Sequence, residues 1–506
     1  MDGINENKTG KVGILTRFLA IILVAALIVA AFSGLTERKD SAKKYRDFLD
    51  NAKEVDVFFL GSSHILNAVD PAQLYYETGI TSYNFGKHGG MLPESYWTFK
   101  LASQYVKPKC VVVDIWSLDR DYKYVDIMSG EDDDTRNTMS LLHTNLDVWP
   151  LSKTKINAIN DLLSNWKTRM EYYFKFSLYH GRWSSLGKED FAGEKNGLND
   201  DTYLLGAEAR REIFINHNMY EPDDKTGIVD DNCISAVYLR KIIEECQSQG
   251  IDILLTFMPM GGLHYQDYQA VNYGKVLSDE YGIEFVNLID KDSQSVIDFL
   301  SDMSDDSHVN EFGMSKITSY LGQRLSEYEN LQDHRNTEGY EMFDEAVNLW
   351  RQKRESNLLS QKDLYMTLGY LEMMDKNFVM YLRGDSNALS DEYIRHQIAK
   401  ISGTDRIEEA KDLGGPYILI KEKDPSTGEA YLYEAASENQ EENIPVIQGN
   451  AEYIGLKNYG ALYYNGDYDN NLFDMDENYH MDVQLFIIGD DGETEADKYF
   501  EVGWKS

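Results

Sequence analysis

Between residues 55 and 331, short apolar runs alternate with segments of helical periodicity. The first run, Val55–Leu60, is almost continuously apolar, which is typical of a central parallel strand covered on both faces. Similar runs predict strands at Thr81–Phe85, Cys110–Ile115, Ile251–Phe257 and Glu284–Leu288. The segments between and after them predict helices at Pro71–Glu77, Leu92–Val106, Cys233–Gln249, His264–Tyr281 and Glu311–Leu331. Because strands alternate with helices, we expect an α/β domain over residues 55–332, with three layers and a mostly parallel sheet.

The pattern changes inside and after this domain. Residues 118–230 lose the periodicity apart from short helical stretches such as Lys155–Tyr173, and we interpret them as an insertion over the sheet. Residues 333–376 predict a helical linker. Short strand-like runs among Asp, Asn and Gly clusters then predict a β-rich accessory domain over residues 377–506. These runs are Phe378–Leu382, Tyr417–Lys421, Ala430–Tyr433, Ala461–Tyr464 and Val483–Ile488.

The N-terminal region contains an uncharged apolar segment at residues 18–35, FLAIILVAALIVAAFSGL. Its length and the basic residues before it predict a transmembrane helix or signal anchor that follows a cytoplasmic segment, 1–17. Residues 36–54 then form a juxtamembrane stalk. The small residues Val29–Ala31 leave a cleaved signal peptide as an alternative. Basic residues also follow the segment, so charge alone does not place the bulk of the chain outside the cell.

Composition excludes several kinds of partner. The 506-residue chain has a formal net charge of -37, which argues against nucleic acid because a phosphate backbone would be repelled. The cysteines, Cys110, Cys233 and Cys246, are odd in number and have no metal-ligand spacing, so neither a disulfide framework nor a metal site is expected. No nucleotide-binding loop is visible, and we expect no cofactor.

A serine at the end of the first strand is the candidate nucleophile. Ser63 follows Gly61 and Ser62, where the ligand crevice of a parallel sheet lies. A serine needs a base, and the base needs an orienting group. Asp305 and His308 stand three residues apart in a turn-like segment that precedes a helix, so Asp305 could hold the His308 ring while its other nitrogen meets Ser63.

These residues resemble the first, second and fifth sequence blocks of the SGNH/GDSL hydrolases in order and separation. The blocks are Gly61–Ser63, Asn84–Gly86 and Asp305–His308, and the resemblance covers Val55–Leu331. It implies a flavodoxin-like fold, Ser63 as nucleophile, and His308 and Asp305 as its partners. It also implies an oxyanion site formed by the backbone N–H groups of Ser63 and Gly86.

More narrowly, the anchored N-terminus and GSSH in place of GDSL resemble bacterial proteins of D-alanyl-teichoic-acid transfer and alginate acetylation. This implies an extracytoplasmic serine esterase or O-acyltransferase, anchored in the cell membrane by a single span. Its substrates would be acetyl or D-alanyl-like esters of a cell-surface glycan, and its partner a membrane-bound O-acyltransferase. Water as the acceptor of the acyl group gives an esterase, and a sugar hydroxyl gives a transferase.

One block departs from the family pattern. The third block, usually Gly-x-Asn-Asp, falls near Val113–Leu118, which reads VDIWSL and lacks Asn. Loss of an oxyanion donor commonly lowers a rate by about 10²–10³-fold. The alternative is therefore a catalytically weak glycan-binding or scaffold protein that partners a membrane acyltransferase. A lipase or thioesterase acting on lipid-like acyl chains is a third possibility.

Five further residues are candidate substrate contacts: His64, His88, His180, Arg182 and Trp183. Arg and Trp suit anions and sugars. The alternative for His64 is a surface or packing role, and His88 is grouped with the other three residues as a candidate substrate contact. For the other three residues the alternative is packing within the insertion.

Overall fold

The computed structural model describes most of the chain. The described residues are 6–36, 45–51, 54–119, 141–174, 176, 179–188, 198, 202–215, 220–289, 296–384, 386–436, 441–454, 461–466 and 481–503. Parts of the predicted stalk, of the insertion and of the accessory domain lie outside these ranges.

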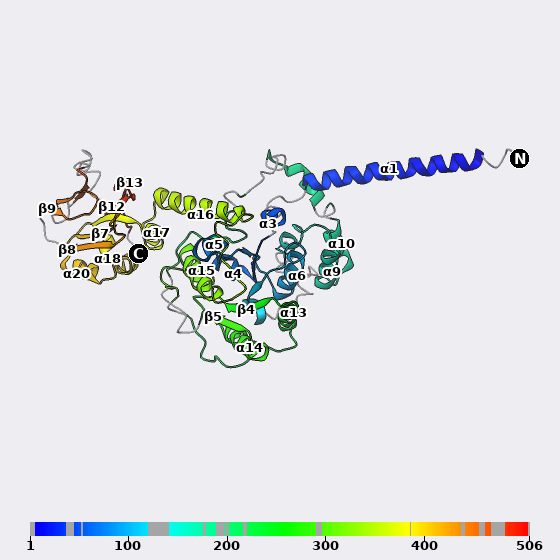
Figure 1. Ribbon diagram of the computed structural model, residues 1–506, viewed down its shortest axis with the longest axis horizontal. Coiled ribbons are helices and arrows are strands. Elements are labelled where there is room, and N and C mark those ends of the chain that lie inside the picture. The colour runs from blue at the N-terminus through cyan, green and yellow to red at the C-terminus, as the bar shows by residue number, and fades with distance from the viewer. Residues whose placement is uncertain are drawn as a thin grey trace.

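A five-stranded parallel sheet forms the centre of the first domain, in the order β2-β1-β3-β4-β5 (Figure 1). The expected α/β class and parallel sheet are therefore confirmed. β1 is buried along its whole length and pairs with a strand on each side, which explains its continuous apolar sequence. The strands are β1 (Val57–Leu60), β2 (Ser82–Asn84), β3 (Cys110–Asp114), β4 (Asp252–Phe257) and β5 (Glu284–Asn287).

Helices cover both faces of this sheet. α5 packs against α15, and α6 packs against α13 (Figure 1). The two helices predicted to reach Val106 and Leu331 end earlier, at Ala102 and Leu325, because the chain continues there in turns with i to i−3 hydrogen bonds. The helices are α4 (Ser63–Ala68), α5 (Pro71–Thr78), α6 (Leu92–Ala102), α13 (Ile234–Gln249), α14 (Tyr265–Tyr281) and α15 (Glu311–Leu325), with a short 3-10 turn, η1 (Trp116–Asp119), after β3.

The described parts of the predicted insertion pack on α6 and on the β2 edge of the sheet, where Asn84 N donates to Leu205 O at 3.0 Å. The single helix expected at Lys155–Tyr173 is two helices, α9 (Lys153–Leu162) and α10 (Trp166–Tyr173), because Asn165 caps a new start. A 3-10 turn, η2 (His180–Ser185), follows. Residues 202–215 then run past α4 and α15: Glu208 N donates to Leu66 O at 3.1 Å, and Glu311 N donates to Arg210 O at 2.9 Å.

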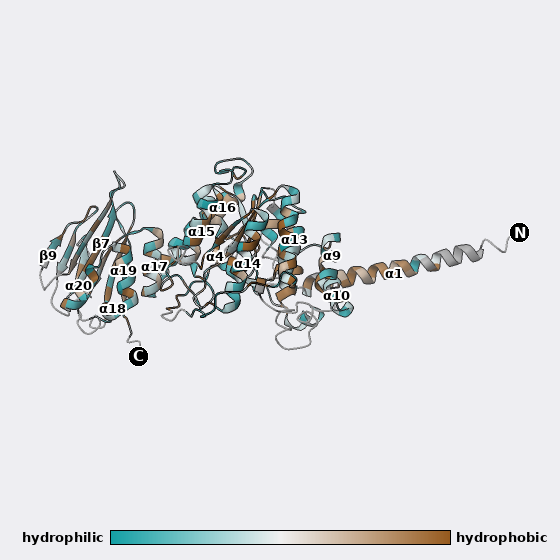
Figure 2. Ribbon diagram, turned by 90° about the horizontal axis from the view of Figure 1, so that it is seen from below, coloured by the Kyte–Doolittle hydropathy of each residue, from teal (hydrophilic) through white to brown (hydrophobic). Residues whose placement is uncertain are grey.

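The N-terminal helix, α1 (Glu6–Thr36), projects away from the rest of the molecule (Figures 1 and 2). Its window Thr16–Ser33 is apolar and not buried at all by the rest of the chain. Among the described residues it is the one helix long and apolar enough to cross a membrane, and a signal sequence would meet the same description. Six residues of the predicted stalk form α3 (Arg46–Asn51).

Two helices connect the first domain to the C-terminal one. α16 (Glu341–Ser360) packs on α5, and α17 (Leu364–Met374) packs on α15, with Asp363 as the N-cap of α17. The helical character predicted for residues 333–376 is present, but these helices belong to the packed fold.

The C-terminal region contains two antiparallel sheets, so the expected β-rich character is confirmed. One has the order β13-β12-β6-β7-β8 and the other β11-β10-β9. Three short helices, which the sequence pattern did not predict, cover part of the larger sheet: α18 (Asn387–Ser390), α19 (Glu392–Ser402) and α20 (Arg406–Leu413). The strands are β6 (Asn377–Leu382), β7 (Tyr417–Lys423), β8 (Ala430–Ala436), β9 (Glu441–Ile444), β10 (Ala451–Ile454), β11 (Ala461–Tyr464), β12 (Val483–Ile488) and β13 (Thr494–Phe500).

Candidate active site

Ser63 lies at the point where β1 passes into α4. This is also the point where the strand order reverses, since β2 lies on one side of β1 and β3 on the other. Gly61 has φ +147°, and a Cβ there would lie 2.8 Å from the Asp114 Cβ, so the turn needs glycine. Ser62 Oγ accepts a hydrogen bond from His64 N at 3.2 Å and caps α4, which leaves Ser63 as its first residue.

A chain of hydrogen bonds joins the three predicted catalytic side chains. Ser63 Oγ lies 2.8 Å from His308 Nε2, and His308 Nδ1 lies 2.9 and 3.0 Å from the two carboxylate oxygens of Asp305. Because Asp305 is an acceptor, it fixes the proton on Nδ1 and leaves Nε2 to accept the Ser63 hydroxyl proton. The structure thus brings together residues 245 positions apart in the sequence.

Electrostatics keep the base neutral and its partner ionised. Burial lowers the pKa of His308 below its ordinary 6.5, and it outweighs the contact with Asp305, which acts in the opposite direction. For Asp305, burial raises the pKa. The hydrogen bonds from Ser307 N and His308, together with the charge of Arg210, lower it by more than burial raises it, so the net shift is downward. At neutral pH a neutral imidazole therefore faces Ser63, as a general base requires.

Arg210 holds Asp305 from the other side. Its Nη1 donates to Asp305 Oδ2 at 2.5 Å, and its Nε donates to Asn67 Oδ1 at 3.1 Å. Sequence analysis missed this residue because it lies in a segment without periodicity, 95 positions before Asp305. Only the path of residues 202–215 past α4 and α15 brings it here.

The loop that carries His308 is fixed by the buried side chain of Asn310. Asn310 Oδ1 accepts from Phe312 N and Gly313 N at 3.0 and 3.1 Å and caps α15. Its Nδ2 donates to Ser301 O at 2.8 Å and to Met303 O at 3.2 Å. One side chain therefore joins the start of α15 to the loop residues that precede Asp305.

The predicted oxyanion donor Gly86 has a hydrogen-bond acceptor within the chain. Gly86 N donates to Asn84 Oδ1 at 2.8 Å, while Asn84 Nδ2 donates to the carbonyls of Ile65 and Val69 at the end of α4. A Cβ at Gly86 would lie 2.6 Å from Leu66 N, so glycine permits close packing against α4. The Gly86 amide is thus engaged with Asn84, and its oxyanion role stays a prediction. Ser63 N, at the start of α4, stays a predicted donor.

Asp114 occupies the place where the family pattern led us to look for an Asn. It ends β3, and its Oδ2 accepts from Ser62 Oγ at 3.2 Å. Burial raises the pKa of Asp114 to about 7, although hydrogen bonds from Ser62 and from backbone amides act against the shift. A buried carboxyl therefore lies directly behind the serine turn.

Two of the predicted substrate contacts lie near this site in different environments. The buried His64 ring stacks on His308, with 5.0 Å between centroids, and its other neighbour is Trp116 at 4.4 Å. His64 therefore lies beside His308, the predicted base, and packs between two rings. His88 is exposed and pairs with Glu208 at 2.7 Å.

The other three predicted contacts lie on η2, next to the end of α1. Arg182 Nη1 donates to Thr36 O at 2.8 Å, and the His180 ring contacts Phe176, which in turn contacts Phe32 of α1. Trp183 is mostly exposed. The structure therefore groups His180, Arg182 and Trp183 with the apolar helix, and does not place them with the serine and its partners.

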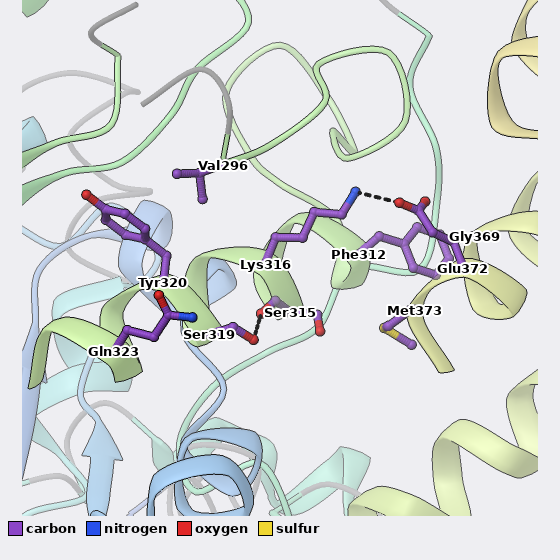
Figure 3. Close-up of a pocket in the computed structure, with 10 residues that line it drawn as sticks. All are labelled: Val296, Phe312, Ser315, Lys316, Ser319, Tyr320, Gln323, Gly369, Glu372 and Met373. Carbon is purple, nitrogen blue, oxygen red and sulfur yellow. Dashed lines mark hydrogen bonds and ion pairs between the residues drawn. The ribbon is translucent and has the colours of Figure 1, made fainter. Parts of the chain in front are cut away.

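A cavity of about 470 Å³ lies between α15 and α17 (Figure 3). Lys316 and Glu372 face each other across it at 3.4 Å. Its walls contain none of the predicted site residues. They are Val296, Phe312, Ser315, Lys316, Ser319, Tyr320, Gln323, Gly369, Glu372 and Met373.

No group of three or more His, Cys, Asp or Glu side chains within the described ranges is arranged to hold a metal ion. In comparisons with known proteins, no family model matches this chain and no curated protein matches it significantly. Any function of this protein has therefore to be inferred from the site itself.

Proposed function

We propose that this protein is a membrane-anchored, extracytoplasmic serine esterase or O-acyltransferase. The observation that carries the proposal is the continuous contact from Ser63 Oγ through His308 to Asp305, with hydrogen-bonding distances of 2.8 and 2.9 Å. His308 accepts the hydroxyl proton while Ser63 attacks the carbonyl carbon of an ester, and an acyl-enzyme forms. The protonated His308 then gives its proton to the leaving alkoxide.

The second half of the reaction uses the same residues. Water or a sugar hydroxyl gives its proton to His308, attacks the acyl-Ser63 ester and releases the acyl group to the acceptor. The proposed substrates are acetyl or D-alanyl-like esters of a cell-surface glycan, and the proposed partner is a membrane-bound O-acyltransferase. Both rest on the resemblance of the three sequence blocks. The apolar helix α1 supports the anchored location.

The direct test is covalent labelling of the full chain, purified in detergent, with a fluorophosphonate probe. We expect one adduct, on the peptide that contains Ser63, and no adduct in Ser63→Ala. In His308→Gln the labelling rate should fall by about 10³-fold or more, because the base is lost. His396→Gln is the matched control, since His396 pairs with Asp298 in a different part of the fold. Absence of an adduct in the folded wild type would contradict the proposal.

Hydrolysis and transfer are then separated with p-nitrophenyl acetate. Release of p-nitrophenol should depend on Ser63 and His308, and adding a simple glucoside as acceptor should divert acetyl from water to sugar if the protein is a transferase. Mass analysis of the glucoside measures this division directly.

A catalytically weak scaffold or glycan-binding protein is the second candidate. It is favoured by two observations: the Gly86 amide is engaged with Asn84, and Val113–Leu118 lacks the amide side chain of the family pattern. Fewer oxyanion donors would slow acyl transfer. Two results together would favour this candidate. The Ser63→Ala variant would bind glycan normally, and the wild type would hydrolyse the ester no faster than this variant does.

A further inference from the structure

The described residues between 151 and 188, here called the membrane-side segment, differ from the rest of the described molecule in their exposed side chains. Outside α1, six described large hydrophobic side chains are 60% or more exposed, and four of the six belong to this segment. These four are Leu151, Trp166, Phe174 and Trp183. Large apolar side chains this exposed are rarely concentrated in one short segment, so the segment has the character of a contact surface.

The charge of the segment is also opposite to that of the chain. Residues 151–188 contain seven Lys and Arg against two Asp and Glu, whereas the whole chain has a formal net charge of -37. Lys153, Lys167 and Lys188 are exposed. A locally basic surface in an acidic protein fits a negatively charged partner.

The segment lies where α1 joins the rest of the protein. Phe32 of α1 and Phe176 are in edge-to-face contact with 5.9 Å between centroids, and Arg182 donates to the carbonyl of Thr36, the last residue of α1. α9 and α10 lie beside this end of the helix (Figures 1 and 2). The 18-residue apolar window of α1, Thr16–Ser33, is about 27 Å long, close to the thickness of the hydrocarbon core of a bilayer.

We propose that the membrane-side segment is a second membrane contact, which rests on the headgroup region of the bilayer that α1 crosses. Trp side chains prefer this region because the ring meets hydrocarbon while the indole N–H stays hydrated. Phe and Leu side chains reach the hydrocarbon, and exposed lysines meet anionic headgroups. The contact fixes the orientation of the α/β domain relative to the membrane. This inference depends on the membrane anchoring in the proposed function, and goes beyond it in assigning a lipid-binding role to residues outside α1.

The test uses the full chain reconstituted into vesicles of phosphatidylcholine with phosphatidylglycerol. Some lipids carry a bromine quencher near the headgroup end of the acyl chain. We expect the quencher to reduce tryptophan fluorescence, and expect most of this reduction to disappear in Trp166→Phe/Trp183→Phe. Trp350→Phe is the control, because Trp350 is buried in α16. Equal quenching in the double variant and the wild type would overturn the proposal.

A charge variant provides an independent measurement. Lys153→Glu/Lys167→Glu/Lys188→Glu should reduce quenching of the two tryptophans in phosphatidylglycerol vesicles, and should have a smaller effect in phosphatidylcholine alone. Resistance to alkaline carbonate extraction reports separately on α1. Resistance without quenching would mean that α1 is anchored and the segment faces another protein, which overturns the lipid contact alone. Complete extraction would overturn both the anchoring and this inference, while leaving the Ser63 chemistry to its own test.

Discussion

At the scale of single residues, the charge balance around His308 decides when Ser63 can react in the proposed mechanism. His308 must be neutral to accept a proton, so kcat/KM should rise with pH through the pKa of His308, which lies below 6.5. Arg210 lowers this pKa by its positive charge. The acidic limb of the pH profile is therefore a measure of the Arg210 contact.

We expect Arg210→Gln to shift that limb to higher pH. Removing the positive charge makes protonation of His308 easier, and Asp305, no longer shared with Arg210, then stabilises the imidazolium more strongly. Arg211→Gln is the matched control, because the neighbouring Arg211 pairs with Glu311. The measurement is kcat/KM for an ester between pH 4.5 and pH 8, a range chosen about the ordinary His pKa. A limb at the same pH in both variants would contradict the assigned role of Arg210.

Asp114 gives a second prediction, on stability. Its folded-state pKa of about 7 lies above the ordinary 3.8, so the folded state binds more protons than the unfolded state between these values. Stability should therefore fall as pH rises through this window, by about 4 kcal/mol at most from this group. Asp114→Asn should remove that loss.

Urea unfolding of wild type and Asp114→Asn at acidic and at slightly alkaline pH measures the difference. The stability of the variant relative to the wild type should improve at the higher pH, whereas the exposed Asp279→Asn should show no such trend. An unchanged difference would mean that the Asp114 carboxyl does not titrate in this window.

The sequence allowed site residues to be predicted where they follow a strand or precede a helix. It did not allow this for residues whose role depends on tertiary contacts. Ser63, Asp305 and His308 could be placed because the end of a parallel strand and the start of a helix are recognisable patterns. The engagement of Gly86 could not be anticipated, since it depends on the Asn84 side chain turning back toward α4. The contact of Arg210 with Asp305 could not be predicted either, because it depends on the path of an irregular segment.

At the scale of elements, α15 and the loop before it form one unit through Asn310. We expect Asn310→Ala to lower the free energy of unfolding by about 2–4 kcal/mol, because it removes a helix cap and the buried donor of the Ser301 carbonyl. The carbonyl of Met303 loses one of two donors and keeps Phe214 N. Chemical denaturation measures this loss. Asp363→Ala, which removes only the cap of α17, should cost about 1 kcal/mol. Equal costs would mean that the contacts to Ser301 and Met303 contribute nothing.

Elements with strong apolar patterns were predicted within a few residues, and weaker ones were missed. β1, β3 and β4 are inner strands, and their short, almost continuously apolar sequences predict a buried strand. β13 is an edge strand with many polar residues, and α18 is four residues long, so neither has a distinctive period. α19 buries an apolar face, but it was not predicted, because it is short and lies among strand-like runs.

At the scale of the whole molecule, α1 and the C-terminal sheets lie at opposite ends, with the α/β domain between them (Figure 1). The C-terminal end of this arrangement depends on the packing of α17 against α15. A Cβ at Gly369 of α17 would lie 2.4 Å from a ring carbon of Phe312 in α15, which shows how closely these two helices approach.

Gly369→Ala should therefore destabilise the protein by about 1–3 kcal/mol, although alanine is the better helix former. If the helices separate, calorimetry should resolve two unfolding transitions in place of one, since each domain has a core of its own. Gly262→Ala is the control, because nothing lies within 4 Å of its added Cβ. A more stable Gly369→Ala variant would show that α17 can move without cost.

The strand order of the larger C-terminal sheet has a consequence for synthesis. β12 is an inner strand, paired with β6 on one side and β13 on the other, yet it is made about a hundred residues after β6. Until Ile488 has left the ribosome, β6 exposes an unpaired edge composed of apolar residues. In the membrane-anchored protein proposed above, α1 is available to the insertion machinery long before this point. We therefore expect the nascent chain to wait at the membrane with this edge open, where a chaperone would prevent pairing with a neighbouring chain.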